Sequence, residues 1–407
     1  MEPHQAYYGL PPEVHYCKKC VISNQRPSST VEFKNRADVP KTTISFDEEG
    51  VCTPCRFAEI KDTVIDWEER ENALWELCDS FRSKKGNYDC IIPGSGGKDS
   101  AFTSHILKHK FKMNPLTVTW SPHIYTDVGL RNFQNWIEAG FDNILFTPNG
   151  KVHRMLSKLA FENLLHPFQP FILGQKYIAP RLSTKFGIPL VFYGENQAEY
   201  GNNIEDNYSP KMGSEYYVSN EPIENIRLGG LSIGELESEH HVSASDLQPY
   251  LPLSQDDVKE TNIEFHYLGY YLKWDPQECY YYASENTAFQ PDDQRTESTF
   301  CKYNSIDDKM DPLHYHTLFI KFGIGRATYD AAQEIRNGKI TREEGVALVK
   351  KYDGEFPNRY LAEILEYLDI SEARLMELID AARSPHLWLA EGETWKLRSP
   401  IWEACTR

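Results

Sequence analysis

The segment 91–100, IIPGSGGKDS, constrains the fold of this chain more than any other feature of its sequence. An apolar run over 88–93 predicts a buried strand, and the apolar spacing over 101–110 predicts a helix. The glycines between them let backbone N–H groups approach an anion, and a helix N-terminus adds about half a positive charge. The segment therefore predicts a phosphate-binding loop. The alternative is a glycine turn that ends a strand and binds no ligand.

The loop does not have the spacing of a Walker A motif, which requires G-x-x-x-x-G-K followed by Ser or Thr. Ile92 stands at the position of the first glycine, and Asp99 stands at the position of Ser or Thr. The residues from Ser95 to Ser100 resemble instead the SGGxDS loop of the PP-loop ATP pyrophosphatases. Enzymes of that family cleave ATP between the α and β phosphates and adenylate a substrate oxygen.

The PP-loop resemblance implies an ATP site. In it, the leaving pyrophosphate is held by Ser95, Gly96, Gly97 and Ser100. Asp99 helps to hold Mg²⁺, which fits the chemistry because a carboxylate in a polyphosphate site needs a metal ion between them. The residues expected to contact ATP are Pro93, Gly94, Ser95, Gly96, Gly97, Ser100, Trp120, Gly194, Glu195 and Asn196. Lys98 and Asp99 are expected to be catalytic.

Strand and helix patterns alternate between residues 87 and 200. Strands are predicted at 88–93, 116–120, 143–146 and 189–193, and helices at 66–83, 101–110, 130–139, 151–165 and 171–186. This alternation predicts an α/β fold with a doubly wound parallel sheet. Ligands of such sheets bind at the carboxyl ends of the strands, which here carry the glycine loop, the segment 120–127 and the segment 194–196.

Four of the nine cysteines form two C-x-x-C pairs near the N-terminus, Cys17 with Cys20 and Cys52 with Cys55. Four thiolates can surround one Zn²⁺ ion in a closed tetrahedral structural site. A redox pair is the alternative, but neither pair opens a helix within a βαβ pattern. The remaining cysteines are scattered and read as small buried residues or chance surface thiols: Cys78, Cys90, Cys279, Cys301 and Cys405.

Composition excludes several classes of protein. The 407 residues carry 43 basic and 60 acidic side chains, a net charge of −17, which argues against tight binding to a nucleic-acid backbone. No run of about 18 apolar residues is present, so no membrane span is expected. The first residues show no signal peptide, and we expect a cytoplasmic protein. The expected domains are a zinc-knuckle module (1–60), a PP-loop domain (61–200), an insertion and substrate-binding region (201–300) and a helical C-terminal region (301–407).

Three further features are ambiguous from sequence alone. Lys321 and Arg326 flank a glycine pair and could neutralise a departing pyrophosphate, or be solvated surface cations. The segment 305–309, SIDDK, could contact Mg²⁺ or substrate, or cap a helix. The aromatic-rich segment 266–282 could stack on sugar rings or a base, or pack in the core. The adjacent His240 and His241 read as solvated side chains rather than as metal ligands.

The C-terminal region is expected to be mostly helical, with helices at 313–320, 327–336, 342–351, 360–368 and 371–382. The segment 341–344, TREE, has the pattern of a capping box.

Several motifs in sequence order resemble the N-acetyl sugar amidotransferase family of bacterial O-antigen and nonulosonic-acid synthesis. They are the paired cysteine knuckles, the SGGKDS loop, and the segments 193–196, 273–278, 305–309, 320–328 and 339–345. The resemblance covers about residues 16–357. It implies that ATP adenylates the amide oxygen of an acetamido group on a nucleotide-activated sugar. Ammonia then displaces AMP and leaves an acetamidino group.

The resemblance also implies partners. A glutaminase of its own would need a nucleophilic cysteine in a G-x-C-x-G elbow or at the mature N-terminus, and neither pattern occurs. The family takes its ammonia from a separate glutaminase subunit, with a cyclase-like barrel as second partner, and a homodimer is left open. The alternatives are a PP-loop enzyme that thiolates tRNA, against which the acidic charge counts, and a non-catalytic zinc-containing scaffold.

Overall fold

A five-stranded parallel sheet forms the centre of the computed structural model, which describes residues 4–28, 31–35, 39–200, 209–259, 261–392 and 394–404. The strand order is β3-β2-β1-β4-β7. The bounds are β1 Cys90–Pro93, β2 Pro115–Trp120, β3 Asp142–Phe146, β4 Leu190–Tyr193 and β7 Glu264–Tyr267. Every neighbouring pair in the sheet is parallel.

Helices cover both faces of this sheet. They are α2 Trp67–Phe81, α3 Lys98–His109, α4 Asp127–Glu138, α5 Gly150–Leu164 and α6 Gln169–Phe186. Ile92 of β1 belongs to the apolar cluster that contains Leu107 of α3, whereas Ile91 belongs to the cluster that contains Ile178 of α6. A parallel strand buried on both faces is apolar at consecutive positions, as β1 is. The doubly wound parallel sheet predicted from the sequence is therefore confirmed.

The strand order reverses direction at β1. The chain moves from β1 through β2 to β3 on one side, and then crosses to β4 on the other side of β1. The connections that leave β1 and β4 consequently diverge and open a crevice at the carboxyl edge of the sheet. The glycine loop, which follows β1, borders this crevice.

The segment between β4 and β7 holds short elements: β5 Arg227–Leu228, β6 Leu231–Ser232, α7 Ile233–His240, α8 Ala244–Leu247 and α9 Gln255–Lys259. The sequence predicted only an insertion here, and part of it (201–208) lies outside the described residues. The edge strand β7 was missed. It pairs with β4, and α10 Leu268–Tyr271 and α11 Pro276–Asn286 follow it.

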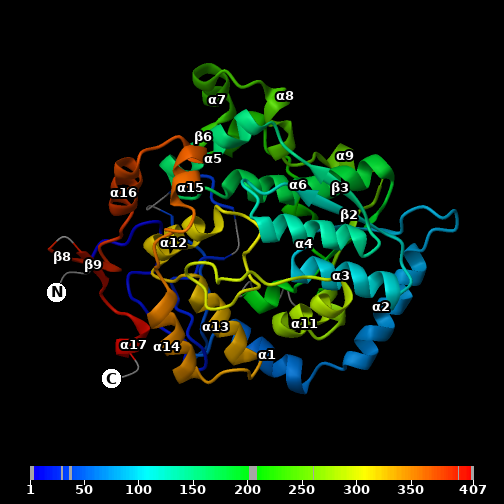
Figure 1. Ribbon diagram of the computed structural model, residues 1–407, viewed down its shortest axis with the longest axis horizontal. Coiled ribbons are helices and arrows are strands. Elements are labelled where there is room, and N and C mark those ends of the chain that lie inside the picture. The colour runs from blue at the N-terminus through cyan, green and yellow to red at the C-terminus, as the bar shows by residue number, and fades with distance from the viewer. Residues whose placement is uncertain are drawn as a thin grey trace.

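The C-terminal region is helical, as predicted. Its helices are α12 Asp311–Phe322, α13 Arg326–Arg336, α14 Arg342–Tyr352, α15 Leu361–Leu368, α16 Glu372–Ala381 and α17 Ile401–Ala404. The capping box at Thr341 and Glu344 is present. Two strands that the sequence did not predict, β8 Trp388–Glu391 and β9 Thr394–Leu397, form a hairpin. In Figure 1 this region lies to the left of the sheet and its helices.

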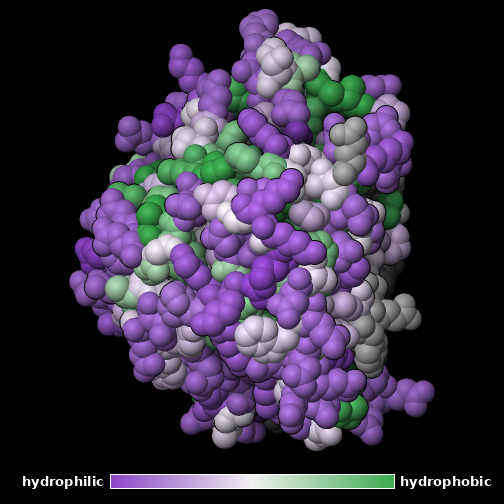
Figure 2. Space-filling model, turned by 90° about the vertical axis from the view of Figure 1, so that its right-hand side faces the viewer, coloured by the Kyte–Doolittle hydropathy of each residue, from purple (hydrophilic) through white to green (hydrophobic). Residues whose placement is uncertain are grey.

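The N-terminal chain packs against the C-terminal region rather than standing apart from it. The Tyr8 hydroxyl donates to the carbonyl of Ala382, and the Tyr16 hydroxyl donates to that of Ser399, each at 2.8 Å. Helix α1, Thr53–Thr63, continues past residue 60. No helix in the described ranges combines the length and the apolar character that a membrane crossing requires. The face seen in Figure 2 is mostly hydrophilic, with some hydrophobic residues in its upper part.

The aromatic segment 266–282 serves mainly as core. Trp274 and Tyr271 are buried in the cluster that covers one face of the sheet. Tyr270 packs against the guanidinium of Arg70, with 3.5 Å between Cζ and the ring centroid. Tyr281, in contrast, is exposed. The core-packing alternative therefore holds for Tyr271 and Trp274.

Candidate active site and metal centre

The glycine loop makes a tight passage from β1 into α3. A Cβ atom on Gly94 would lie 2.1 Å from the Cβ of Ser100, so the backbone can approach the start of α3 only without a side chain there. Gly96 has a φ of +84°, and a Cβ on it would lie 2.8 Å from the Cα of Phe133. These contacts explain why glycine occupies both positions, and they direct the start of α3 toward the crevice.

A cavity of about 250 Å³ lies against this loop. Its lining includes eight of the ten residues expected to contact ATP, namely Pro93, Gly94, Ser95, Gly97, Ser100, Trp120, Gly194 and Glu195. Gly96 and Asn196 are not among the lining residues of this cavity. The Oδ1 atom of Asn196 accepts a bond from the Ala198 N–H and so shapes the turn after β4.

Within the described part of the chain, three buried polar atoms of this first cavity have no hydrogen-bond partner. They are Asp99 Oδ1, Thr103 Oγ1 and Trp120 Nε1. Buried polar groups are normally paired, because an unpaired one costs about 1–3 kcal/mol. Together they provide two acceptors and two donors, since the hydroxyl does both. This is the pattern expected of a site that is completed by a polar ligand.

A second cavity, of about 390 Å³, shares a wall with the first. The shared residues are Ser95, Gly97, Asp99, Gln175 and Glu195. The rest of its lining comes largely from the C-terminal half and includes Tyr303, Asp307, Asp308, Asp311, Tyr315 and Arg326, together with Lys98. A ligand in the second cavity would therefore meet a ligand of the first across the glycine loop.

Burial and neighbouring charges shift the pKa values of the carboxyl groups that line the two cavities. Burial and the neighbouring Asp99 raise the pKa of Glu195. Burial also raises the pKa of Asp307, which the Ser95 hydroxyl partly offsets, and it raises that of Asp311, with the charges of Asp307 and Asp308 adding to the effect. Perturbed carboxyl groups gathered in a cleft are typical of functional sites.

Lys98 and Asp99 form an ion pair at the first turn of α3, with 2.6 Å between Nζ and Oδ2. Burial disfavours the charge of Lys98, but Asp99 holds its pKa above the ordinary value. Asp99 thus presents a free oxygen to the first cavity while its other oxygen is held by a cation. One or two carboxylates together with phosphate oxygens are the usual ligands of Mg²⁺, so Asp99 fits this ion.

The structure places Lys321 and Arg326 in different cavities, although the sequence suggested that both could neutralise the pyrophosphate. Arg326 begins α13 and lines the second cavity, where its Nε donates to Asp330 at 2.9 Å. Lys321 lies in a different cavity, at the end of α12, and pairs with Glu32 at 2.5 Å. Gly323, with a φ of +66°, ends α12 between them and turns the chain. Lys321 is therefore not positioned at the glycine loop.

The segment 305–309 contributes to the second cavity through Asp307 and Asp308. Asp308 accepts bonds from the backbone N–H and the Nδ1 of His123, both at 2.7 Å. It also accepts a bond from the Met310 N–H, but Met310 itself is the N-cap of α12 and that helix has no side-chain cap bond, so the capping alternative does not hold. His240 and His241 end α7 and are not among the described groups that could share a metal ion.

Sequence reasoning missed several cavity residues. Thr103 lies one turn after Ser100 on the same face of α3, a spacing that could have revealed it. Gln175 of α6 and Asp311 of α12 come from segments far away in the chain, and no local pattern marks them.

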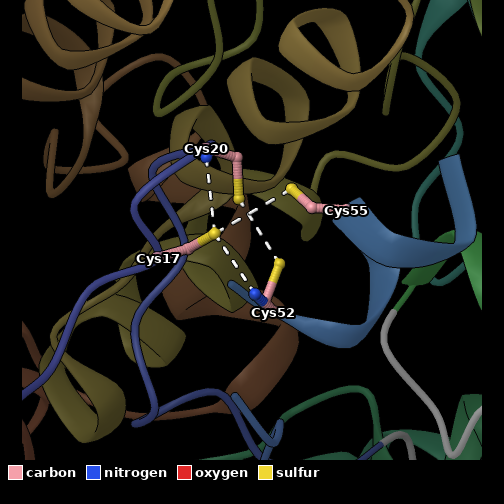
Figure 3. A group of neighbouring side chains, drawn as sticks. All are labelled: Cys17, Cys20, Cys52 and Cys55. Carbon is pink, nitrogen blue, oxygen red and sulfur yellow. Dashed lines mark hydrogen bonds between the residues drawn. The ribbon is translucent and has the colours of Figure 1, made fainter. Parts of the chain in front are cut away.

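The four N-terminal cysteines converge on one point (Figure 3). All four are buried, and their sulfur atoms lie within 4.8 Å of one another. The Sγ atoms of Cys17 and Cys55 are 3.9 Å apart, and those of Cys20 and Cys52 are 3.6 Å apart. A tetrahedron with Zn–S bonds of about 2.3 Å has sulfur–sulfur edges of about 3.8 Å. The spacing fits a single tetrahedral metal ion.

Backbone groups support this centre. The N–H groups of Lys19 and Cys52 point to the Sγ of Cys17, each at 3.3 Å. Arg342 of α14 donates from Nε to the carbonyl of Cys20 at 3.1 Å and from Nη2 to that of Cys17 at 3.2 Å. These two hydrogen bonds link the four-cysteine site to α14 of the C-terminal region.

Comparison with known proteins identifies the C-terminal part of the chain. Residues 297–400 match a family model described as "LPS biosynthesis protein WbpG-like, C-terminal domain". This part of the chain is thus similar to a domain of lipopolysaccharide biosynthesis proteins. The matched residues include Asp307, Asp311 and Arg326 of the second cavity.

Two other similarities are weaker. The uncharacterized protein MJ1599 of Methanocaldococcus jannaschii is 32% identical over 78 residues, or 19% of this chain. The chain spans only 27% of that relative's length. The fold is also similar to the structure of the U34-tRNA thiolase NcsA from Methanococcus maripaludis with its 4Fe-4S cluster. The alignment covers 80% of this chain and 91% of the thiolase chain, at 11% sequence identity. Its TM-score of 0.28 is too low to support any functional conclusion.

Proposed function

We propose that this chain is the ATP-dependent synthetase of a sugar amidotransferase that acts in lipopolysaccharide O-antigen or related surface-glycan biosynthesis. It would convert an acetamido group of a nucleotide-activated sugar into an acetamidino group. The amide oxygen attacks the α-phosphorus of ATP, and pyrophosphate leaves. Ammonia then adds to the carbon of the O-adenyl imidate, and the C–O bond breaks to release AMP.

The observation that carries this proposal is the wall shared by the two cavities. The first cavity has the PP-loop sequence on its surface and three unpaired polar atoms. The second takes ten of its 22 lining residues from the segment that matches lipopolysaccharide biosynthesis proteins. A reaction between ATP and a sugar substrate needs such neighbouring sites, because the two reacting atoms must approach to about 3 Å.

The residues around the shared wall have distinct roles in this proposal. The N–H groups at the start of α3 and the Ser95 hydroxyl would hold the departing pyrophosphate. Lys98 would balance its charge from the same turn. Arg326, on the far side of the second cavity, would hold the substrate or the developing negative charge.

Two metal ions belong to the proposal. Mg²⁺, held in part by Asp99, would supply charge neutralisation at the phosphates. Zn²⁺, held by the four cysteines, would be structural, because a site with four protein ligands leaves no position open for a substrate.

The ammonia would come from a partner glutaminase, with a cyclase-like barrel as a further subunit and a homodimer left open. An enclosed path from the partner would exclude water, which competes with ammonia for the imidate. The reaction would run in the cytoplasm, where ATP is available.

A tRNA-thiolating enzyme is the less supported alternative. Such enzymes usually have a catalytic cysteine, and reactive cysteines have lowered pKa values. Burial instead raises the pKa of Cys78 to about 12 and that of Cys301 to about 11, and it raises the pKa of Cys90 and Cys279. Cys405 lies outside the described residues.

One assay tests the proposed reaction. The protein is incubated with a panel of nucleotide-linked acetamido sugars, ATP with Mg²⁺, and an ammonium salt. We expect AMP release that depends on one of the sugars, and a product lighter by the difference between O and NH. AMP release that is independent of every sugar, or absent with all of them, would overturn the proposal.

A further inference from the structure

A third cavity, of about 550 Å³, lies farther along the same edge of the sheet. It forms where β2 and β3 end and α5 begins. Its lining includes His123 after β2, Thr147 after β3, and Lys151, His153 and Arg154 of α5. It shares no lining residue with the two cavities of the proposed active site.

The charge of this cavity is opposite to that of the chain as a whole. None of its described lining residues is a carboxylate, although the chain carries 60 acidic residues against 43 basic ones. The exposed Lys151 and Arg154 stand in the first turns of α5, a helix of 15 residues. A Cβ on Gly150 would meet no atom within 4 Å, so the helix N-terminus opens onto free space. A helix N-terminus with two nearby cations favours an anion.

Two buried histidines give independent support for a ligand. His153 is 3% exposed; its Nδ1 pairs with the Tyr250 hydroxyl at 3.0 Å, and its Nε2 has no partner among the described residues. The side chain of His123 is fully buried; its Nδ1 pairs with Asp308 at 2.7 Å, and no described residue pairs with its Nε2 either. Both rings line the cavity. Two unpaired imidazole nitrogens at one buried site indicate a missing polar partner.

The third cavity adjoins the second through the pair of His123 and Asp308, because His123 lines the third and Asp308 lines the second. The glycine loop follows β1 and the third cavity follows β3, two strands away. Neighbouring strands are about 4.8 Å apart, so the two sites lie about 10 Å from each other along the sheet edge. A hexose ring with its glycosidic phosphate spans a similar length.

We propose that this cavity binds the diphosphate of a nucleotide-linked sugar while the sugar occupies the second cavity. The inference rests on the proposed function for the identity of the sugar substrate. The Lys151 and Arg154 side chains, N–H groups at the start of α5 and the Nε2–H of a histidine would contact the phosphate oxygens. The acetamido group would then point toward the glycine loop.

Binding of uridine diphosphate by the full-length protein tests this site without any turnover. The titration is made by calorimetry with a non-hydrolysable ATP analogue present to fill the glycine loop. We expect wild type to bind uridine diphosphate more tightly than inorganic phosphate. The double variant Lys151→Ala/Arg154→Gln should weaken binding about tenfold or more, as expected for two lost charge-assisted contacts. Lys158→Ala is the matched control, because Lys158 lies on the same helix, pairs with Asp369 and does not line the cavity.

Three results would overturn the assignment: no binding to wild type, equal affinity of wild type and the double variant, or equal affinity for phosphate and uridine diphosphate. Failure of the proposed reaction is a separate result. It would appear as missing sugar-dependent AMP release, while the affinity ratio between wild type and the double variant would stand unchanged.

Discussion

The sequence context of Lys321 suggests that it neutralises pyrophosphate, whereas its position in the structure gives it an ion pair with Glu32. The substitution Lys321→Met distinguishes these two roles. Lys321 is 1% exposed and pairs with Glu32, and its Nζ also donates to the carbonyl of Leu164 at 2.8 Å. Burial disfavours the Glu32 carboxylate, but Lys321 and Lys41 together lower its pKa from the ordinary 4.5 to about 2. The pair lines a cavity that shares none of its described lining residues with the proposed phosphate site, so we expect it to act on folding.

The pKa of Glu32 sets the size of the effect. A pKa lowered from 4.5 to about 2 corresponds to about 3 kcal/mol of stability at neutral pH. Lys41 remains 2.5 Å from Glu32 in the variant, so part of this is retained. The buried carbonyl of Leu164 loses its donor, which adds to the cost, and removing a buried ammonium offsets some of it. We expect Lys321→Met to lower the free energy of unfolding by about 2 kcal/mol.

The sign of the pH dependence follows from the same group. A carboxyl group with a lowered folded pKa stabilises the protein above its unfolded pKa of about 4.5 and stops doing so as the pH falls toward 2. The difference between wild type and Lys321→Met should therefore be full at neutral pH and shrink below about pH 4.5.

Chemical denaturation at pH 7 and pH 3.5 measures this difference. Lys350→Met, at an exposed position of α14, is the control and should change stability by less than about 0.5 kcal/mol. Pyrophosphate formation at 25 °C should stay within about twofold of wild type in Lys321→Met. The reasoning is refuted if this variant keeps its stability but loses ATP cleavage, because Lys321 would then serve the phosphates as its sequence context suggests.

Three further predictions concern the two centres. Asp99→Asn should fold normally and lose pyrophosphate formation by roughly 100-fold or more, because it removes the carboxylate offered to Mg²⁺; full activity would remove Asp99 from that role. Cys52→Ser should lower the zinc content, measured by a chromogenic chelator after unfolding, and destabilise the N-terminal module; an unchanged zinc content would contradict the four-cysteine site. Gly194→Ala should raise the KM for ATP, because its Cβ would lie 2.7 Å from the Trp274 ring and 2.9 Å from Thr103 Oγ1; an unchanged KM would mean that this wall does not contact ATP.

The sequence predicted the sheet and the C-terminal helices well because their patterns are local. Consecutive apolar residues mark β1 and β4, and the helical spacing of α12 to α16 was predicted to within a few residues at each end. Strand β7 was missed for a physical reason. Glu264 and His266 interrupt its apolar residues, and its aromatic side chains resemble those of the helical segment that follows.

The site was only partly predictable, because its second cavity depends on contacts between distant segments. The glycine loop and the cysteine knuckles carry their chemistry in a few adjacent residues. Asp308, by contrast, gains its position through His123, which lies 185 residues away. Lys321 and Arg326 are close in sequence, yet the left-handed conformation of Gly323 sends them to different cavities. Proximity in the chain gave no indication of this separation.

Transfer of an isotopic label tests most directly the claim that a sugar amide attacks ATP across the shared wall. The substrate is a nucleotide-linked sugar with ¹⁸O in its acetamido carbonyl, and the AMP released in the presence of ammonia is analysed by mass spectrometry. Because the amide oxygen bonds to the α-phosphorus and leaves with it, the account predicts that the AMP carries the label. Unlabelled AMP, with the ¹⁸O still on the sugar, would show that water cleaves ATP and would contradict the account.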